Sequence, residues 1–253
     1  MANKMKILIT GAKGFIGKNL IARLNSCDEK HIIYSYDIDS TREDLEEYVK
    51  DCDFVFNFAA VHRPKENEDF DKTNHLFFDE LLSMLQGNNN KCPVLYTSSI
   101  QATNGTPYGN SKLAAENDLR CYAEKTGARA IIYRLTNTFG RWATPNHHSV
   151  VATFCYNIVR GLPIVVNDPD IVMNFYYIDD VIASFMDQLT SSPLADEDGI
   201  YRLPTEMIYT VTLGELAQLL QGFKHSLDEG RAPKIDTLLE QNLYTTYLSY
   251  AEG

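Results

Sequence analysis

The sequence predicts a doubly wound α/β protein, with helices on both faces of a parallel sheet and a small C-terminal lobe. Short apolar runs alternate with amphipathic helical segments along the chain, the pattern typical of a parallel sheet. Three glycines stand between the first apolar run and the first helical segment. The 253 residues, 44% of them hydrophobic, are enough for one large domain with a lobe. We expect a core of roughly residues 1–140 and a lobe of roughly 141–175 and 200–253.

Each expected strand is a short run rich in β-branched and aromatic residues that ends in a polar or glycine-containing segment. The expected strands are 5–10, 31–37, 52–60, 92–99, 128–135 and 162–168. The helices are expected from apolar residues three or four apart, as at Ile16, Leu20 and Leu24, and from Ser40 or Thr41 as a cap. The expected helices are 14–25, 41–51, 74–87, 108–127, 150–161, 177–189, 213–227 and 235–248.

The loop "ITGAKGFIG" places Gly11, Gly14 and Gly17 between the first strand and the first helix. Glycine allows the backbone to approach a pyrophosphate closely, and the free N–H groups of the helix N-terminus favour its negative charge. The loop therefore predicts a Rossmann-type dinucleotide site. The alternative is that the glycines serve only the turn and helix–sheet packing. Between Asp37 and Phe54 there is room for one short helix only, so we expect a shortened segment under the adenosine end.

The segment "SSIQATNGTPYGNSK" places a hydroxyl, a phenol and an ammonium close together. Ser99 ends a predicted strand, where ligands of parallel sheets bind. Tyr108 and Lys112 are four residues apart on a predicted helix and share one face. A nearby ammonium favours the phenolate and is expected to lower the pKa of Tyr108 from about 10. The alternative is an ordinary exposed pair on a helix.

The formal net charge of −11 argues against nucleic acid or an anionic membrane surface as the main partner. The five cysteines are scattered and lack metal-ligand spacing, so we expect reduced thiols in a cytoplasmic protein and no bound metal. No apolar run reaches the length of a membrane span, and the first strand begins too early for a signal peptide.

The motifs "TGAKGFIG", "FNFAA", "YGNSK", "RLTNTFG" and "FYYIDDV", in that order, resemble the extended short-chain dehydrogenases/reductases that act on nucleotide sugars. The resemblance implies a catalytic set of Ser99, Tyr108 and Lys112. It also implies cofactor contacts from the glycine loop, from the end of the third strand, and from the catalytic helix. These are Gly11, Lys13, Gly14, Phe15, Ile16, Gly17, Asp37, Phe58, Ala59, Ala60, Tyr108, Lys112 and Leu135.

"SSIQAT", "PYGNSKL" and "LYTTYLSY" are similar to stretches of the CapF type of capsular polysaccharide reductase. That family carries a C-terminal cupin domain, which we expect this chain to lack because it stops at "LSYAEG". The spacing of nine between Ser99 and Tyr108 is shared with the CapF type, whereas other relatives have more than twenty residues there. The resemblance implies NAD(P)H-dependent reduction of the C4 ketone of a UDP-linked 6-deoxy-4-keto-N-acetylhexosamine.

Two other functions stay open: a nucleotide-sugar 4-epimerase or dehydratase, and a cofactor-binding regulatory subunit without catalysis. Dehydratases of the group carry an Asp-Glu pair after the serine, where this chain has Ile100 and Gln101. The arginine that relatives place before "FYYIDD" is replaced by Met173-Asn174, so other residues are expected to bind the UDP-sugar. The candidate substrate residues are Ser99, Ile100, Gln101, Arg63, Asn137, Arg141 and His147.

The signals for the cofactor conflict. Asp37 ends the second strand, where an acid normally binds the ribose 2′-hydroxyl of NADH and repels a 2′-phosphate. Lys13 lies in the glycine loop, where reductases of this superfamily often bind that phosphate. The family resemblance implies NADPH, which we therefore expect, with NADH as the alternative.

The resemblance also implies a homodimer that pairs through the helix from Leu76 to Leu85 and the helix that carries Tyr108. Leucines on both helices are expected to supply the apolar surface. These are Leu81, Leu82, Leu85, Leu113 and Leu119. The alternative is that they all face the sheet.

Overall fold

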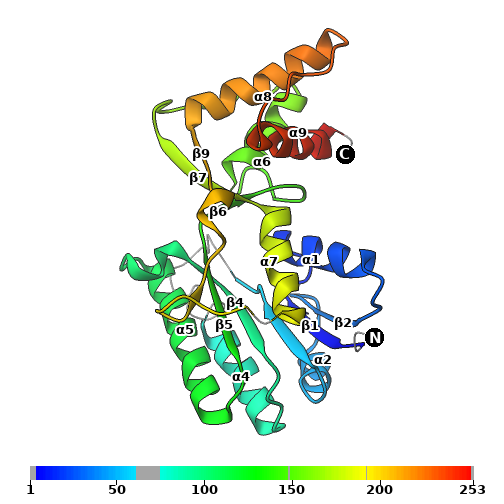
Figure 1. Ribbon diagram of the computed structural model, residues 1–253, viewed down its shortest axis with the longest axis vertical. Helices are drawn as coiled ribbons and strands as arrows, with labels where there is room; N and C mark the ends of the chain where they lie inside the picture. Colours follow the sequence, from blue (N-terminus) through cyan, green and yellow to red (C-terminus); the bar gives the residue numbers. More distant parts are fainter. Residues whose placement is uncertain (1–3, 61–74, 148, 192, 252–253) are drawn as a thin grey trace. The chain divides into compact units, whose positions relative to one another are not determined.

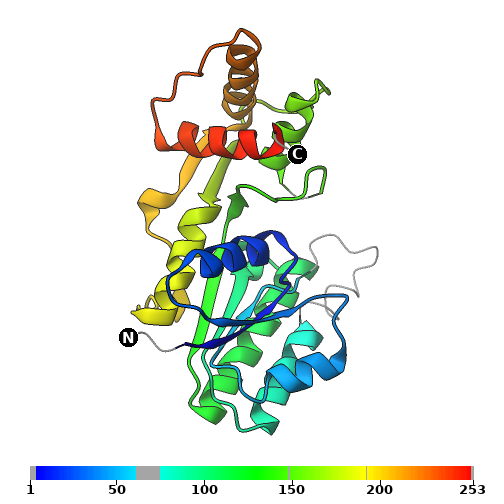
Figure 2. The same cartoon turned by 90° about the vertical axis from the view of Figure 1, so that its right-hand side faces the viewer.

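The computed structural model describes residues 4–60, 75–147, 149–191 and 193–251. The chain divides into two compact units, each with its own sheet (Figures 1 and 2). The first unit comprises Met1–Leu135 and Met186–Arg202, and the second comprises Thr136–Phe185 and Leu203–Gly253.

The first unit contains a six-stranded parallel sheet in the order β2-β1-β3-β4-β5-β8. This order confirms the predicted doubly wound α/β fold. The strands are β1 (Lys6–Thr10), β2 (Ile32–Tyr36), β3 (Phe54–Asn57), β4 (Val94–Ser99), β5 (Ala130–Leu135) and β8 (Ile200–Tyr201). Between β2 and β3 the structure contains only the helix α2 (Arg42–Tyr48), so the predicted shortened segment is confirmed. Thr41, one of the two proposed caps, closes a capping box with Asp44.

One face of this sheet is covered by α2, α4 (Phe77–Gly87) and α5 (Pro107–Thr126), which share a single apolar core with the strands. Leu8, Val55 and Val94 contribute the sheet side of that core. The helix α1 (Phe15–Ser26) follows β1 directly and buries Leu20 and Leu24. Because all six strands run parallel, the carboxyl ends of β1, β3 and β4 lie at the same edge of the sheet.

Four of the five leucines proposed for a dimer seam lie inside this core. Leu81, Leu85 and Leu119 have no exposed surface, Leu82 is 3% exposed, and Leu113 is half-buried. The expectation that an exposed apolar surface is supplied by Leu81, Leu82, Leu85 and Leu119 is wrong, because these four side chains pack in the core against the sheet, as the alternative reading has it. Leu113 is partly exposed, so its place in a dimer surface stays a prediction.

The second unit contains a three-stranded sheet of β6 (Asn137–Phe139), β7 (Val172–Tyr177) and β9 (Tyr209–Thr212), in the order β6-β7-β9. Its helices are α6 (Val150–Val159), α8 (Leu213–Asp228) and α9 (Leu238–Ala251), and α7 (Ile178–Thr190) begins in this unit and ends in the first. The described residues also include two short 3-10 helices, η2 (Ile100–Thr103) in the first unit and η3 (Thr205–Met207) in the second.

The strand expected at 162–168 is wrong, because these residues form an irregular segment. Leu162 and Val165 are 49% and 71% exposed, so the apolar run is not buried by a sheet. The side-chain amide of Asn157 donates to the carbonyl of Pro163 at 3.1 Å, which ties the segment to α6 instead.

Candidate active site

The glycine loop packs tightly against the end of β3. Gly11 has a φ of +64°, and a Cβ there would lie 2.8 Å from the backbone of Phe58 and Ala59. A Cβ on Gly17 would lie 2.3 Å from the carbonyl oxygen of Gly11. Gly14 caps α1 with no side chain, which leaves the N-terminal N–H groups of Phe15 and Ile16 facing the loop. The structure therefore brings together the glycine loop and the "FAA" segment, as expected for a dinucleotide cradle.

Asp37 is held against the loop by backbone hydrogen bonds. Its carboxylate accepts the N–H of Lys13 at 2.7 Å and the N–H of Ile38 at 2.8 Å. The ammonium of Lys13 pairs instead with Asp39, and this bond raises the pKa of Lys13. Two carboxylates and one ammonium thus lie together at the end of β2.

Ser99 and Tyr108 lie side by side at the carboxyl end of β4. The peptide N–H of Gln101 donates to Ser99 Oγ at 3.1 Å and begins η2, and the chain then turns into α5 at Thr106. This compact turn explains how Tyr108 can follow Ser99 by only nine positions. A hydrogen bond links the side chains of Tyr108 and Ser99.

The pKa of Tyr108 differs from the sequence-based expectation. Burial raises the pKa to about 12, and the hydrogen bond with Ser99 opposes this rise only in part. The ammonium of Lys112 lies 5.9 Å from the centre of the Tyr108 ring. The lowered pKa predicted from the Tyr-Lys spacing is therefore wrong for this chain, because desolvation of the phenolate is the largest influence on Tyr108.

Lys112 is 2% exposed, and its Nζ donates to the carbonyl of Thr97 at 3.0 Å. The same Nζ lies 4.9 Å from the centre of the Tyr96 ring. Burial lowers the pKa of Lys112 to about 7, and the carboxylate of Glu116 acts in the opposite direction. A lysine pKa lowered this far by burial is typical of functional sites.

Hydrogen bonds connect Lys112 to the end of β1. Thr97, which accepts from Lys112, donates from its hydroxyl to the carbonyl of Asn57 at 3.4 Å. The hydroxyl of Thr10 donates to Asn57 Oδ1 at 2.5 Å and accepts the N–H of Ala59 at 3.3 Å. The catalytic candidates and the glycine loop therefore belong to one connected site in the first unit.

The residues present fit a dinucleotide cofactor. The backbone at Gly11 and Gly17 leaves no room for side chains, as a closely bound pyrophosphate requires. The Asn57 side chain is fully buried, and among the described residues its Nδ2 has no hydrogen-bond partner. A buried amide of this kind is suited to donate to a ligand. Asn57 was not among the predicted site residues, although a polar residue within the apolar run "FVFNF" signals it.

The remaining candidates are distributed as follows. Leu135 is buried opposite Ser99 in the β4–β5 register, and Ile100 and Gln101 are exposed on η2. Asn137, Arg141 and His147 are exposed residues of the second unit. Arg63 lies outside the described residues. The substrate contacts proposed for these residues stay predictions.

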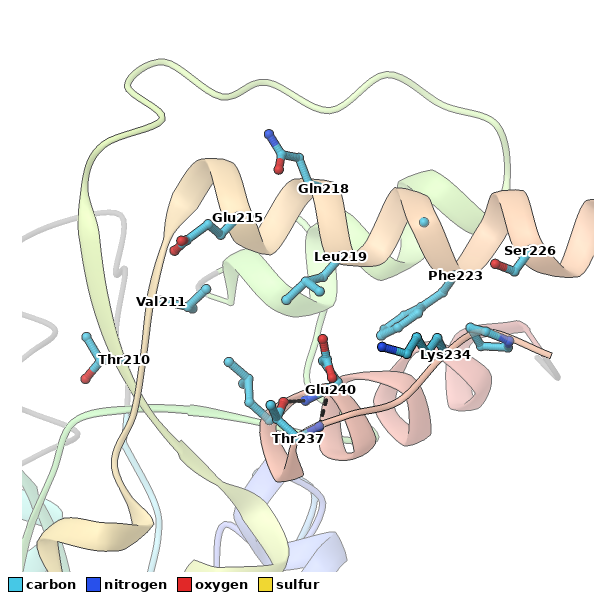
Figure 3. Close-up of a pocket in the computed structure, with 13 residues that line it drawn as sticks. Thr210, Val211, Glu215, Gln218, Leu219, Phe223, Ser226, Lys234, Thr237 and Glu240 are labelled. Carbon is cyan, nitrogen blue, oxygen red and sulfur yellow. Dashed lines mark hydrogen bonds between the residues drawn. The ribbon is translucent and has the colours of Figure 1, made fainter.

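The second unit contains a cavity of about 590 Å³ beside α8. Figure 3 shows Leu219 and Phe223 pointing from α8 toward the segment that carries Lys234. Glu215 accepts the N–H of Thr212 at 2.9 Å as a helix cap. Glu240 accepts the N–H groups of Asp236 and Thr237 at 2.7 and 2.8 Å. These two carboxylates thus hold the starts of α8 and α9.

Other kinds of site are not seen in the part of the chain that the structure describes. No group of three His, Cys, Asp or Glu there could hold a metal ion. None of the helices described is long and apolar enough to cross a membrane.

Comparisons with known proteins agree with this geometry. A family model described as "NAD dependent epimerase/dehydratase family" matches residues 7–201. The chain is 38% identical, over 97% of its length, to the UDP-2-acetamido-2,6-beta-L-arabino-hexul-4-ose reductase of Pseudomonas aeruginosa, of which it covers 65%. It superposes on capsular polysaccharide assembling protein CapF from Staphylococcus aureus with a TM-score of 0.87 and 42% identity, covering 97% of this chain and 66% of that one.

The chain thus spans slightly less than two thirds of these two relatives. The UDP-glucose 4-epimerase of Thermotoga maritima shares the fold over 98% of this chain and 99% of its own, with a TM-score of 0.78 at 21% identity.

Proposed function

Because the chain belongs to the NAD dependent epimerase/dehydratase family, we propose that it is an NAD(P)H-dependent reductase of a nucleotide sugar. The substrate is the C4 ketone of a UDP-linked 6-deoxy-4-keto-N-acetylhexosamine, and the product serves capsular or surface polysaccharide synthesis. The observation that carries this proposal is the 38% identity to a reductase named for a UDP-linked 4-ketosugar, over 97% of this chain. The hydrogen-bonded Ser99 and Tyr108 beside the buried Lys112 support it.

When bound, the reduced nicotinamide supplies a hydride to the carbonyl carbon. The carbonyl oxygen then needs a proton, and Tyr108 is suited to hold it because its pKa of about 12 keeps the phenol protonated at neutral pH. Ser99 orients the carbonyl oxygen beside the phenol. The ammonium of Lys112 binds the ribose hydroxyls and favours the phenolate that remains after proton transfer.

The first unit supplies the cofactor contacts of this proposal. Gly11, Gly14 and Gly17 let the backbone approach the pyrophosphate, and the start of α1 provides N–H groups for its charge. Asn57 donates a hydrogen bond from its buried amide to the cofactor. We take NADPH as the preferred form and NADH as the alternative. Asn137, Arg141 and His147 of the second unit are the proposed contacts to the sugar nucleotide.

The proposal is tested by the consumption of reduced cofactor with the UDP-linked 4-ketosugar, for the wild type and for Tyr108→Phe. We expect the wild type to oxidise one reduced cofactor for each molecule of ketosugar that it reduces. The variant should lose about a hundredfold or more in kcat with nearly unchanged cofactor affinity, because the phenol acts only where the proton moves. A Tyr108→Phe protein that keeps a tenth or more of the wild-type kcat contradicts the role of Tyr108.

The same assay separates the other functions. An epimerase or dehydratase converts the sugar without net consumption of reduced cofactor, because it returns the hydride to the same molecule. A regulatory subunit binds the cofactor and converts nothing. Ile100 and Gln101 at the position after Ser99 offer no acid–base pair for elimination, which disfavours the dehydratase.

A further inference from the structure

Glu116 is a fully buried carboxylate in the same helix as the catalytic candidates, and the proposed reaction gives it no role. Tyr108, Lys112 and Glu116 follow one another at intervals of four residues, so they lie along one face of α5. That face points to the carboxyl half of β4 and to β5, since Lys112 bonds to Thr97 and Glu116 bonds to Ser98 and Arg134.

Two strands and one helix supply the hydrogen bonds to Glu116. Ser98 Oγ donates to Oε1 at 2.5 Å, and Arg134 donates to both oxygens, at 2.9 Å from Nε and 2.7 Å from its terminal nitrogen. Arg120 adds contacts at 3.4 Å. Burial acts to raise the pKa of Glu116, but the bonds from Arg134 and Ser98 bring it below its ordinary value. The carboxylate is therefore charged at neutral pH.

Glu116 is the one carboxylate that counteracts the desolvation of Lys112 in the part of the chain described. The other titratable groups that face Lys112 are the rings of Tyr96 from β4 and Tyr108 from α5. The further charges nearby act on Tyr96 or on Arg134. Asp118 of α5 pairs with His75 at 2.9 Å, and Asp198 and Arg202 act on Arg134.

We propose that Glu116 is a positioning residue that keeps Lys112 charged, with Arg134 as the counter-ion that limits this effect. Through Ser98 the same carboxylate also holds the end of β4 next to Ser99. The proposal rests on the proposed function, in which the charge of Lys112 serves both the ribose and the phenol. The competing explanation is a buried ion pair that only fastens α5 to β4 and β5.

The two explanations predict different changes in the pKa of Lys112 when Glu116 or Arg134 is substituted. Glu116→Gln removes the negative charge beside Lys112 and leaves that of Arg134, so the pKa of Lys112 should fall. Arg134→Gln removes the opposing cation and leaves the carboxylate bonded to Ser98 and Arg120, so the pKa should rise. The fall in Glu116→Gln should be about one pH unit or more, for two charges at i,i+4 on one helix, about 6 Å apart, at an effective dielectric constant of about 20. If the ion pair is purely structural, both variants should lose the same stability, and the pKa of Lys112 should not move in opposite directions.

The pKa of Lys112 is measured directly by NMR titration of 13Cε-labelled lysine, with the signal assigned by its loss in Lys112→Met. This readout needs no substrate and no turnover. In parallel, the pH profile of kcat/KM is recorded, and its alkaline limit should move to lower pH in Glu116→Gln and to higher pH in Arg134→Gln. Glu116→Asp retains the charge and should retain a Lys112 titration close to that of the wild type.

The proposal is overturned if Glu116→Gln and Arg134→Gln move the pKa of Lys112 in the same direction, or if neither moves it. If Glu116→Gln does not fold, Arg134→Gln and Glu116→Asp decide it: a fall of the Lys112 pKa in either one rejects it. If the pKa of Lys112 measured by NMR moves in opposite directions in the two variants but the protein reduces no ketosugar, the charge effect is sustained and the proposed function is rejected. Failure of the proposal and failure of the proposed function are therefore distinguishable.

Discussion

At the scale of single residues, the end of β2 contains two carboxylates for one ammonium. Asp37 accepts the N–H of Lys13, whereas the Lys13 ammonium pairs with Asp39. In the proposed binding mode, a 2′-phosphate of NADPH therefore competes with Asp39 for Lys13 and lies near the charge of Asp37. We expect the preference between NADPH and NADH to depend on how these three side chains rearrange around the ribose.

Substitutions at these positions should separate the two cofactors. Lys13→Ala should weaken NADPH about ten- to a hundredfold more than NADH, because only NADPH has the phosphate that a charge-assisted hydrogen bond would reach. Asp37→Asn removes the charge and keeps an oxygen acceptor for the loop, so it should weaken NADH and spare NADPH. Asp39→Asn frees Lys13 and should strengthen NADPH.

The dissociation constants of both cofactors, measured by fluorescence titration for the wild type and the three variants, test this expectation. If the wild type binds NADH more tightly and Lys13→Ala affects both cofactors equally, Asp37 governs the choice and the preference for NADPH is wrong.

At the scale of elements, the junction of η2 and α5 sets the distance between Ser99 and Tyr108. Thr106 caps α5 by accepting the N–H of Gly109 at 3.1 Å. A Cβ on Gly109 would lie 2.2 Å from the carbonyl oxygen of Gln101 and 2.5 Å from Oδ1 of Asn104. The junction therefore admits only glycine at this position without moving η2 away from the helix.

Gly109→Ala should lower the free energy of unfolding by about 1–3 kcal/mol, the usual cost of overpacking, and should lower kcat because Ser99 and Tyr108 move apart. Gly222→Ala is the matched control, since Gly222 is also inside a helix and a Cβ there meets nothing within 4 Å. It should raise the free energy of unfolding by about 0.5–1 kcal/mol and leave kcat unchanged. Urea denaturation and turnover measurements on the two variants test whether the junction requires glycine at position 109. Equal stability of the two variants would contradict this requirement.

The sequence could predict the elements and positions that local patterns specify. The glycine loop and the Tyr-Lys pair depend on short spacings, and α8 was expected at 213–227 and lies at Leu213–Asp228. The bonds of Glu116 to Arg134 and of Asn57 to Thr10 join residues 18 and 47 positions apart, and periodicity carries no information on such pairs. The raised pKa of Tyr108 could not be predicted for the same reason. It results from burial, which depends on the tertiary fold, whereas the sequence shows only the spacing between Tyr108 and Lys112.

At the scale of the whole molecule, the leucines of α4 belong to the core that joins α2, α4 and α5 to the sheet. Leu85 has no exposed surface, whereas Leu76, just before α4, is 50% exposed. If copies of the chain associate along this helix, exposed residues such as Leu76 must form the contact. The homodimer itself stays a prediction, and its apolar surface cannot consist of the four leucines that are buried in the core.

Leu85→Ala should therefore lower the free energy of unfolding by about 2–5 kcal/mol, because it removes buried methyl groups and leaves a cavity in the core. Leu76→Ala should change that free energy by less than about 1 kcal/mol, since half of its side chain is already in water. Urea denaturation gives the free energies, and light scattering of the native proteins gives their mass. The mass of the Leu85→Ala protein should equal that of the wild type. A Leu85→Ala protein with wild-type stability and a smaller mass would instead place Leu85 between two copies of the chain.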